Sequence, residues 1–364
     1  MARPVMIMAG GTGGHVFPAL AVADELRGRG VEVVWMGTLR GLEAKVVPAA
    51  GIPLECIGVQ GLRGKGLLSW IGAPWNVLRA VIQAARVLAR HRPRVVLGMG
   101  GFVAGPGGVA SRLMGMKLII HEQNAIAGLT NRMLAPLAHR VFEAFPATFV
   151  PRRKARAVGN PVRASIVAVT DPAQRFAGRS GALRVLIVGG SLGAQVFNEM
   201  VPAALTQIPQ PQRPEVWHQT GAAHIDVARR NYAAAGVTAR VDAFIDDMAQ
   251  AYGWADLVIC RSGALTVSEL AAAGVGSVLV PFPFAVDDHQ RANAEFLTCV
   301  GAAELVLQQD LTPAVLARII ERYFTADGSP DRQRLLAMAQ AARSVAMTDA
   351  ARVVAESCLE AQRV

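Results

Sequence analysis

The feature that most constrains the fold is a short apolar run followed by a glycine turn and a helical pattern, repeated along the chain. The first copy is "PVMIMAGGTGGHVFPAL", and further apolar runs follow at 31–37, 94–101 and 117–124. This order is typical of βαβ units, which build a parallel sheet covered by helices. The pattern predicts a doubly wound α/β domain.

The same pattern begins again in the second half, at "LRVLIVGGSLGAQVFN" (183–198), and continues through residue 283. At 364 residues the chain exceeds the size at which one hydrophobic core usually stops growing. The intervening stretch 145–163 is rich in proline and basic residues. We therefore predict an α/β fold of two Rossmann-like domains, 1–160 and 161–364, facing a cleft. The last helical pattern, 332–363, could pack on either domain.

The net charge of +10 is concentrated in the first half. Residues 1–160 carry 20 Lys/Arg and seven Asp/Glu, whereas residues 161–364 carry 17 and 20. Clustered basic residues favour an anionic partner, either a membrane surface or nucleic acid. Few aromatic residues lie among the basic ones and no familiar nucleic-acid motif occurs, so the sequence argues against nucleic acid.

The four cysteines, at 56, 260, 299 and 358, are widely separated. Their spacing indicates neither a zinc site nor a disulfide framework, and a reduced, cytoplasmic location is the default expectation. The apolar run 5–9 is too short for a signal peptide, and no run of about 18 apolar residues predicts a membrane span.

Two glycine loops, 10–14 and 189–193, follow apolar runs and precede helical patterns. Such loops present backbone N–H groups and a helix N-terminus to an anion, although many serve only tight packing. The run 31–37 is not followed by an acidic residue, which argues against a nicotinamide cofactor. Neither loop has the lysine of a P-loop.

A third candidate is "CRSGALTVSELAAAG" (260–274). Ser262 is a suitable N-cap, after which the N–H groups of residues 263–265 would be available to a diphosphate. Glu269 lies farther along this helix. Its carboxylate is either an ordinary exposed helix side chain or an acceptor for the ribose hydroxyls of a nucleotide.

Several separated motifs resemble, in order, those of the MurG family of peptidoglycan glycosyltransferases. They are "GGTGGHVFPAL", "GLRGKG" (61–66), "GMGGFVAGPGG" (98–108), "HEQNAIAGLTN" (121–131), "GNPVR" (159–163), "FIDDMAQAY" (244–252) and "CRSGALTVSEL". The resemblance implies the GT-B architecture and transfer of N-acetylglucosamine from UDP-N-acetylglucosamine to a lipid-linked muramyl-pentapeptide acceptor.

The resemblance also implies a donor site, carried over motif by motif. Residues that would meet the diphosphate and sugar are Ser191, Arg163, Ala264, Leu265, Thr266, Val267 and Ser268. Glu269 would bind the ribose and the backbone at Ile245 the uracil. Residues that would close around the donor are Thr12, Gly13, Gly14, Asn124 and Gln290. Leu192 stands where the family more often has Gln, and aligning Asn293 requires a one-residue shift, which makes Gln290 less secure than Glu269.

The family reaction is an inverting displacement that needs a base for the acceptor hydroxyl. His15, directly after the first glycine loop, is the leading candidate, because imidazole changes charge near neutral pH. Alternatively, His15 orients the loop or binds the acceptor diphosphate, and Glu122 is the second candidate base. No metal motif occurs, so we expect catalysis without metal or other cofactor, with loop N–H groups and Arg163 stabilising the leaving diphosphate.

The stretch 67–92 places Arg79, Arg86 and Arg90 in one helical stripe and Ile71, Trp75, Leu78 and Ile82 in the neighbouring arc. With Trp70, this face could lie on the anionic cytoplasmic surface of a bacterial membrane. The alternative is a surface helix that packs its apolar arc inward.

Two other functions remain open from the residues. A UDP-N-acetylglucosamine epimerase can share the two-domain architecture but needs no acceptor. A non-catalytic, membrane-bound sensor of nucleotide sugar would keep the donor site without turnover.

Overall fold

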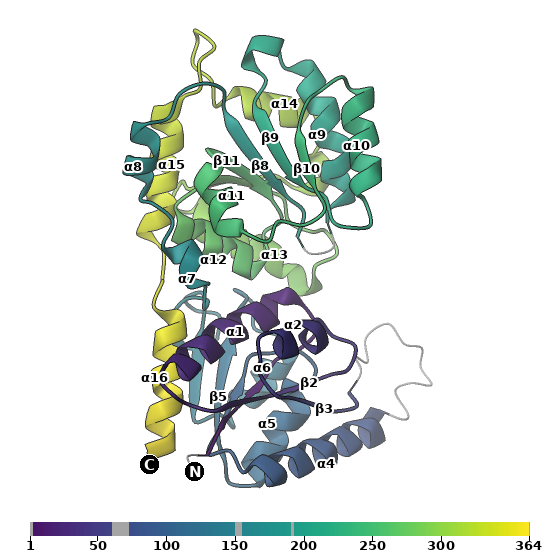
Figure 1. The fold of residues 1–364 in the computed structure, drawn as a ribbon, viewed down its shortest axis with the longest axis vertical. Coiled ribbons are helices and arrows are strands. Elements are labelled where there is room, and N and C mark those ends of the chain that lie inside the picture. Colours follow the sequence, from purple (N-terminus) through teal and green to yellow (C-terminus); the bar gives the residue numbers. More distant parts are fainter. Residues whose placement is uncertain (1–2, 60–72, 150–154, 191–192, 364) are drawn as a thin grey trace. The chain divides into compact units, whose positions relative to one another are not determined.

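The computed structural model describes residues 3–59, 73–149, 155–190 and 193–363. The chain forms two compact units, the first comprising Met1–Arg163 with Thr348–Val364 and the second Ala164–Met347 (Figure 1). The predicted division at residue 160 lies close to the point, after Arg163, at which the chain passes from the first unit to the second. Each unit is built on one parallel sheet with helices, as the repeated strand, glycine turn and helix pattern predicts.

The first unit contains a sheet that, among the described residues, has seven strands in the order β3-β2-β1-β4-β5-β6-β7, all parallel. All residues of β1, β2 and β4 are buried, as expected for strands covered on both faces. The elements are β1 (Val5–Met8), α1 (Gly13–Gly28), β2 (Val33–Gly37), α2 (Glu43–Ala49), β3 (Leu54–Cys56), α4 (Ala73–His91), β4 (Val95–Gly98), α5 (Ala104–Leu113), β5 (Lys117–Glu122), α6 (Leu129–Leu134), β6 (Arg140–Glu143), β7 (Arg156–Ala157) and α16 (Ala350–Arg363).

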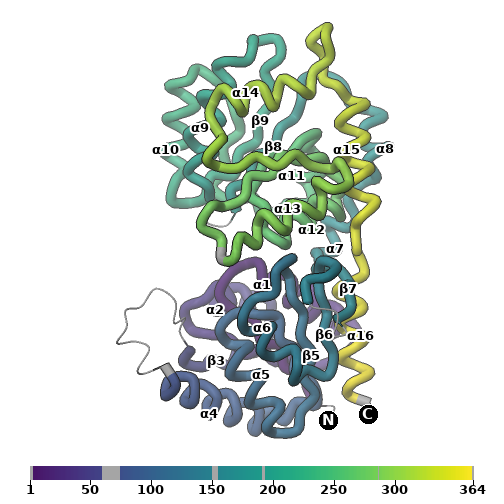
Figure 2. The backbone as a smooth tube through the Cα atoms, turned by 180° about the vertical axis from the view of Figure 1, so that it is seen from behind, coloured from purple at the N-terminus to yellow at the C-terminus, as the bar shows by residue number. Residues whose placement is uncertain are grey.

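The end of the chain returns to the first unit. Helix α16 runs beside α1 (Figure 1) and lies next to the strands of the sheet when seen from behind (Figure 2), and Ala350, Val354 and Cys358 join the hydrophobic core that includes Val5 and Ile7 of β1. The helical pattern at 332–363 is therefore two helices. The first, α15, belongs to the second unit, and only α16 packs in the first.

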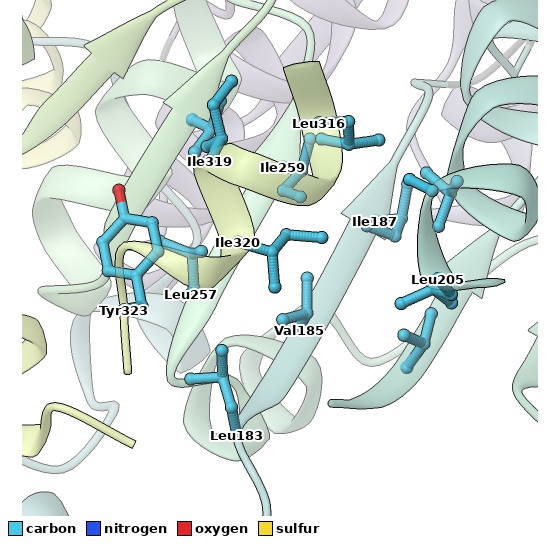
Figure 3. Close-up of a cluster of buried hydrophobic side chains, with 14 of the residues drawn as sticks. Leu183, Val185, Ile187, Leu205, Leu257, Ile259, Leu316, Ile319, Ile320 and Tyr323 are labelled. Atoms are coloured by element: carbon cyan, nitrogen blue, oxygen red, sulfur yellow. The ribbon is translucent and has the colours of Figure 1, made fainter. Parts of the chain in front are cut away.

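The second unit repeats the design, with six described strands in the order β10-β9-β8-β11-β12-β13. Its core lies between the sheet and helices α9 and α14, where Val185, Ile187 and Ile259 meet Leu205 and Ile320 (Figure 3). The elements are α7 (Ala164–Val167), α8 (Pro172–Ala177), β8 (Arg184–Val188), α9 (Gln195–Gln207), η2 (Gln210–Gln212), β9 (Glu215–Gln219), α10 (Ile225–Ala234), β10 (Arg240–Asp242), α11 (Met248–Trp254), β11 (Leu257–Cys260), α12 (Ala264–Ala273), β12 (Gly276–Leu279), η3 (Val286–Asp288), α13 (His289–Thr298), β13 (Ala303–Leu305), η4 (Gln308–Asp310), α14 (Pro313–Glu321) and α15 (Arg332–Ser344).

Both sheets reverse their strand order at the same relative place, between β1 and β4 in the first unit and between β8 and β11 in the second. Ligands of open α/β sheets bind at this switch point, outside the carboxyl ends of the strands. The loops after these four strands are 9–12, 99–103, 189–194 and 261–263. The fold thus brings the glycine motifs to the two candidate binding edges.

Candidate functional site

The first glycine loop joins β1 to α1 at the switch point of the first unit. Helix α1 begins at Gly13 after an extended N-cap residue, Thr12, whose side chain makes no capping hydrogen bond. The first N–H groups of a helix have no acceptor within it, and the helix dipole adds positive potential there. Thr12, Gly13 and Gly14 thus form an end of α1 that can receive an anionic group.

A buried carboxylate, Glu43, holds this loop in place. It accepts hydrogen bonds from the N–H of Gly11 (2.9 Å), the N–H of Thr38 (3.0 Å) and the hydroxyl of Thr38 (2.7 Å). Its side chain is fully buried. A Cβ atom on Gly10 would lie 2.6 Å from a Glu43 carboxylate oxygen, so a side chain at that position would displace the carboxylate from its hydrogen bonds.

His15 lies in the first turn of α1 and is partly buried. Its Nδ1 atom is 2.8 Å from Oε1 of Gln123, which directly follows β5. Gly100, after β4, packs against this pair, since a Cβ atom there would lie 2.7 Å from His15 Nδ1. Three strand ends, those of β1, β4 and β5, therefore fix the His15 ring.

Behind Gln123 lies a second histidine, His121, which is fully buried. Its Nδ1 is 3.1 Å from Nε2 of Gln123, and its Nε2 is 2.9 Å from the carbonyl oxygen of Gly159. Burial lowers the pKa of His121 to about 4, against smaller opposing effects of Gly159 and Glu122. The imidazole is therefore neutral at physiological pH.

Glu122, the second candidate base, is buried, and its carboxylate is hydrogen-bonded to the loop that follows it. Its carboxylate accepts from the N–H of Asn124 (3.0 Å), the side chain of Asn124 (3.3 Å), the N–H of Gly128 (3.0 Å) and the side chain of Asn131 (2.9 Å). This arrangement organises the loop 124–131 and orients Asn124.

Arg163 is the last residue of the first stretch of the first unit. Its guanidinium lies 5.9 Å from the centroid of the Phe17 ring, in the cation–π range. Phe17 is on α1, one turn after the glycine loop. The positive charge of Arg163 is thus held near the start of α1.

In the second unit, the glycine loop after β8 is packed tightly onto the neighbouring strand. Gly193 has φ +76°, and a Cβ atom there would collide with the carbonyl of Thr220. Gln219, at the end of β9, donates to the carbonyl of Gly190 (3.0 Å). Ser191 and Leu192 lie outside the described residues, so the predicted role of Ser191 remains a prediction.

The helix after β11 differs from expectation at its start. The N-cap of α12 is Gly263, not Ser262, and the helix begins at Ala264. Ser262 is fully buried, and its hydroxyl has no hydrogen-bond partner within the described part of the chain. The first turn, Ala264 to Thr266, with Val267 and Ser268 behind it, is the end of α12 that could receive an anion.

Glu269 is not the exposed helix carboxylate of the alternative interpretation. It is 6% exposed, and its Oε2 accepts a hydrogen bond from the hydroxyl of Tyr252 on α11 (3.0 Å). Ile245, in the loop that precedes α11, is buried. Helix α11 thus lies beside α12.

Helix α13 contacts the ends of two strands. The N–H of Phe282, after β12, donates to Oε1 of Gln290 (2.9 Å), and Asn293 donates to the carbonyl of Ser262 (3.2 Å). Arg261 donates to the carbonyls of Val280 and Pro281, both at 3.1 Å. These bonds orient Gln290 at the same edge as α12.

The apolar arc of α4 faces outward. Trp75, Leu78 and Ile82 are 66%, 47% and 43% exposed, and Arg79 and Arg86 are exposed beside them. The alternative, in which this arc packs inward, is wrong: the buried residues of α4 are Ala80, Ala84, Val87 and Leu88, which pack in the core. Residues 61–66, Trp70 and Ile71 lie outside the described residues.

Helix α5 packs against α4, and α6 packs against α5; both also carry exposed apolar side chains. They are Val109, Leu113 and Met114 at α5 and Leu129 and Met133 on α6. Within the described residues, no helix has the length and hydropathy to cross a bilayer, and no three His, Cys, Asp or Glu side chains cluster as metal ligands would.

Three residues of this arrangement, Glu43, Gln123 and Gly100, were not identified from the sequence alone. Gln123 carries a signal, since "HEQN" places four consecutive polar side chains at the end of a buried strand, where they must find partners. Glu43 lies in an amphipathic stretch that resembles any helix start, and only folding brings it beneath the glycine loop.

Comparison with known proteins identifies both units. The N-terminal domain model of glycosyltransferase family 28 matches residues 5–143, and the C-terminal domain model of the same family matches residues 184–360. A relative from Nitrosococcus oceani is 57% identical over 360 residues, covering 99% of both chains. One from Alkalilimnicola ehrlichii is 56% identical over 363 residues, covering all of both. Both are named UDP-N-acetylglucosamine–N-acetylmuramyl-(pentapeptide) pyrophosphoryl-undecaprenol N-acetylglucosamine transferase.

Solved structures agree. The crystal structure of MurG from Acinetobacter baumannii is similar with a TM-score of 0.84 at 42% identity, covering 98% of this chain and 99% of that one. The Anabaena protein HepE, solved in complex with UDP and glucose, has a TM-score of 0.63 at 15% identity over 98% and 99% of the two chains, and shares the fold alone. The chain is a glycosyltransferase of the GT-B architecture that belongs to glycosyltransferase family 28 and, within it, to the MurG family.

Proposed function

We propose that the protein transfers N-acetylglucosamine from UDP-N-acetylglucosamine to the 4-hydroxyl of the muramyl sugar of undecaprenyl-pyrophosphoryl-MurNAc-pentapeptide. The observation that carries this proposal is the 57% identity over nearly the whole chain with a relative that bears the name of that activity. The glycine loops lie at strand ends, His15 and Gln290 lie in the first turns of α1 and α13, and Glu269 lies in the second turn of α12, where such a reaction could use them.

The donor's nucleotide would bind in the second unit. The N-terminus of α12, with its partial positive charge, suits the diphosphate, and the buried hydroxyl of Ser262 adds a donor directly before it. Glu269, held by Tyr252, would accept from the ribose hydroxyls, and the backbone of Ile245 would pair with the uracil. Gln290 and Ser191, together with Thr12, Gly13, Gly14 and Asn124, would complete the contacts to the sugar.

The reaction is a single displacement with inversion. The acceptor 4-oxygen forms a bond to the anomeric carbon while the bond from that carbon to the UDP oxygen breaks, and the hydroxyl proton passes to a base. Charge that develops on the leaving diphosphate would be stabilised by the N–H groups of α12 and by Arg163, in place of a metal ion.

His15 suits the role of base better than Glu122. His15 is partly buried at the start of α1, whereas the carboxylate of Glu122 already accepts four hydrogen bonds from its own loop. Both oxygens of that carboxylate are therefore already engaged by donors of the loop, which leaves it poorly placed to reach the acceptor hydroxyl. We assign the proton transfer to His15 and the organisation of the loop to Glu122.

The lipid-linked acceptor requires access to a membrane. The exposed arc of α4, with Trp75, Leu78 and Ile82 beside Arg79 and Arg86, has the chemistry of a helix that lies on an anionic surface. Exposed apolar side chains on α5, which packs against α4, and on α6, which packs against α5, add further apolar surface in this unit. We propose peripheral binding at the cytoplasmic face of the bacterial membrane, where the acceptor's headgroup is presented.

The test is transfer of labelled N-acetylglucosamine from UDP to the lipid-linked muramyl acceptor, with and without chelator. We expect chelator-resistant transfer. Glu269→Ala should weaken UDP binding at least tenfold, because a buried carboxylate pairing with hydroxyls is worth about 1.5–3 kcal/mol. His15→Ala should instead lower kcat by about 10²–10⁴-fold and leave UDP affinity nearly unchanged.

Two results would contradict the proposed transfer activity, and a third would contradict only the assignment of His15 as the base. Conversion of UDP-N-acetylglucosamine without acceptor would indicate an epimerase. Binding of UDP-N-acetylglucosamine with no turnover on authentic acceptor would indicate a sensor. An unchanged kcat in His15→Ala would remove His15 from the catalytic role while leaving the transfer activity intact.

A further inference from the structure

A continuous line of hydrogen bonds joins His15 to the backbone of the first unit. It runs from His15 Nδ1 to Gln123 Oε1 (2.8 Å), from Gln123 Nε2 to His121 Nδ1 (3.1 Å), and from His121 Nε2 to the carbonyl oxygen of Gly159 (2.9 Å). The three side chains come from α1 and the end of β5, and Gly159 follows β7.

The chemistry of the groups sets the direction of every bond in this line. The carbonyl of Gly159 can only accept, so Nε2 of His121 carries the hydrogen. His121 is fully buried and neutral, so its Nδ1 is an acceptor and must receive a hydrogen from the amide group of Gln123. The carbonyl of His121, 3.1 Å from Gln123 Nε2, requires the same amide orientation.

With its NH₂ group directed at His121, Gln123 presents only an oxygen to His15. That oxygen accepts, so the hydrogen of the neutral His15 ring is on Nδ1, and the lone pair is on Nε2. We propose that Gln123 and His121 are positioning residues that hold His15 in the tautomer with a basic Nε2. The inference rests on the proposed role of His15 as the base.

The line also explains how His15 keeps its orientation during proton transfer. The acceptor hydroxyl gives its proton to Nε2 as the bond from oxygen to the anomeric carbon forms, and the ring becomes an imidazolium. Its Nδ1–H still donates to Gln123 Oε1, so no group in the line has to move. Gln123 is itself fixed, because its backbone carbonyl accepts from the side chain of Asn160 (3.0 Å).

A matched pair of substitutions at His121 tests whether this line of hydrogen bonds positions His15. His121→Asn keeps an acceptor where Nδ1 lies, whereas His121→Gln keeps only a donor where Nε2 lies. We expect His121→Asn to stay within about threefold of the native kcat. His121→Gln should lose about 10–100-fold, part of the factor that a general base contributes, with the KM for UDP-N-acetylglucosamine within twofold of native. Equal kcat losses in both variants would overturn the inference.

A direct measurement on the unaltered full-length chain keeps the inference testable even where a variant fails to fold. Nitrogen NMR of ¹⁵N-histidine protein, with the His15 signal assigned by His15→Gln, distinguishes the two tautomers. We expect the hydrogen on Nδ1 of His15, and a hydrogen on Nε2 would overturn the inference. The tautomer is measured without substrate, so the two claims can fail separately. An unchanged kcat in His15→Ala would show that His15 is not the base, whereas the other tautomer would show that Gln123 and His121 do not position its ring as proposed.

Discussion

At the scale of single residues, the position of the His15 ring depends on Gly100 having no side chain. Gly100 has φ +99°, a backbone conformation that costs other residues about 1–2 kcal/mol. A Cβ atom at Gly100 would also lie 2.7 Å from Nδ1 of His15 and 2.9 Å from its Cε1. A side chain here would therefore displace the ring that we assign as the base.

Gly100→Ala and Gly115→Ala separate these two effects. Gly115 also has a positive φ (+74°), but a Cβ atom there would meet nothing within 4 Å in the described chain. We expect both variants to lose about 1–2 kcal/mol of unfolding free energy from the backbone. Only Gly100→Ala should also lose kcat, by tenfold or more, because a small misplacement of a catalytic group is costly.

Denaturant unfolding and the transfer assay, carried out on the same preparations, measure the two effects. A Gly100→Ala protein with native kcat would show that the His15 ring tolerates displacement. That result would weaken the assignment of His15 as the base and the proposed positioning of its ring by Gln123 and His121.

At the scale of elements, the fold does not account for the exposed apolar side chains of α4. Its small and aliphatic residues Ala80, Ala84, Val87 and Leu88 already supply the buried face, yet Trp75, Leu78 and Ile82 remain exposed. Exposed apolar residues that gather on one face mark an interaction surface. The arginines beside them indicate an anionic one.

We expect the triple variant Arg79→Ala, Arg86→Ala, Arg90→Ala to bind anionic phospholipid vesicles roughly 100-fold more weakly, since each basic residue near such a surface contributes about 1 kcal/mol. Vesicle cosedimentation at rising salt measures this. The matched control replaces three exposed arginines of the second unit, Arg229, Arg230 and Arg318, with the same loss of charge. Equal weakening in both variants would indicate a general charge effect and contradict a membrane face at α4.

At the scale of the whole molecule, each unit contains one buried histidine that is neutral when folded. Burial lowers the pKa of His121 to about 4 in the first unit and that of His218 to about 3 in the second. The unfolded chain binds protons at these positions below about pH 6.5. The unfolding free energy therefore falls as the pH drops from 6.5 towards 4 or 3, and these histidines contribute no pH dependence above about pH 7.

Between pH 7 and pH 5, each histidine should cost its unit on the order of 2 kcal/mol of unfolding free energy. Calorimetry at the two pH values measures the transitions. In His218→Asn, the pH dependence of the second unit should become smaller, and that of the first should not change. A stability that is flat in wild-type protein from pH 7 to 5 would contradict the neutral, buried state of both side chains.

The class of fold could be predicted from the repeated order of apolar run, glycine turn and helical pattern. Short apolar runs that end in glycine turns and alternate with helical patterns are typical of central parallel strands, so the two α/β units and the places of the glycine loops followed from local pattern. The motifs led to the family for the same reason, because each is a short contiguous stretch. The helical pattern at 332–363 did not reveal its own division, since α15 and α16 are both amphipathic and their partners are distant in sequence.

The sequence by itself determined the class of fold, the family and the stretches that carry the chemistry, because those depend on residues that are neighbours along the chain. Only the tertiary structure decided what each polar side chain does. Glu269 became a buried partner of Tyr252, Glu43 the support of the first glycine loop, and Gln123 the link between two histidines 106 positions apart in the sequence. Such roles depend on which strand ends meet at a switch point, and no local pattern contains that information.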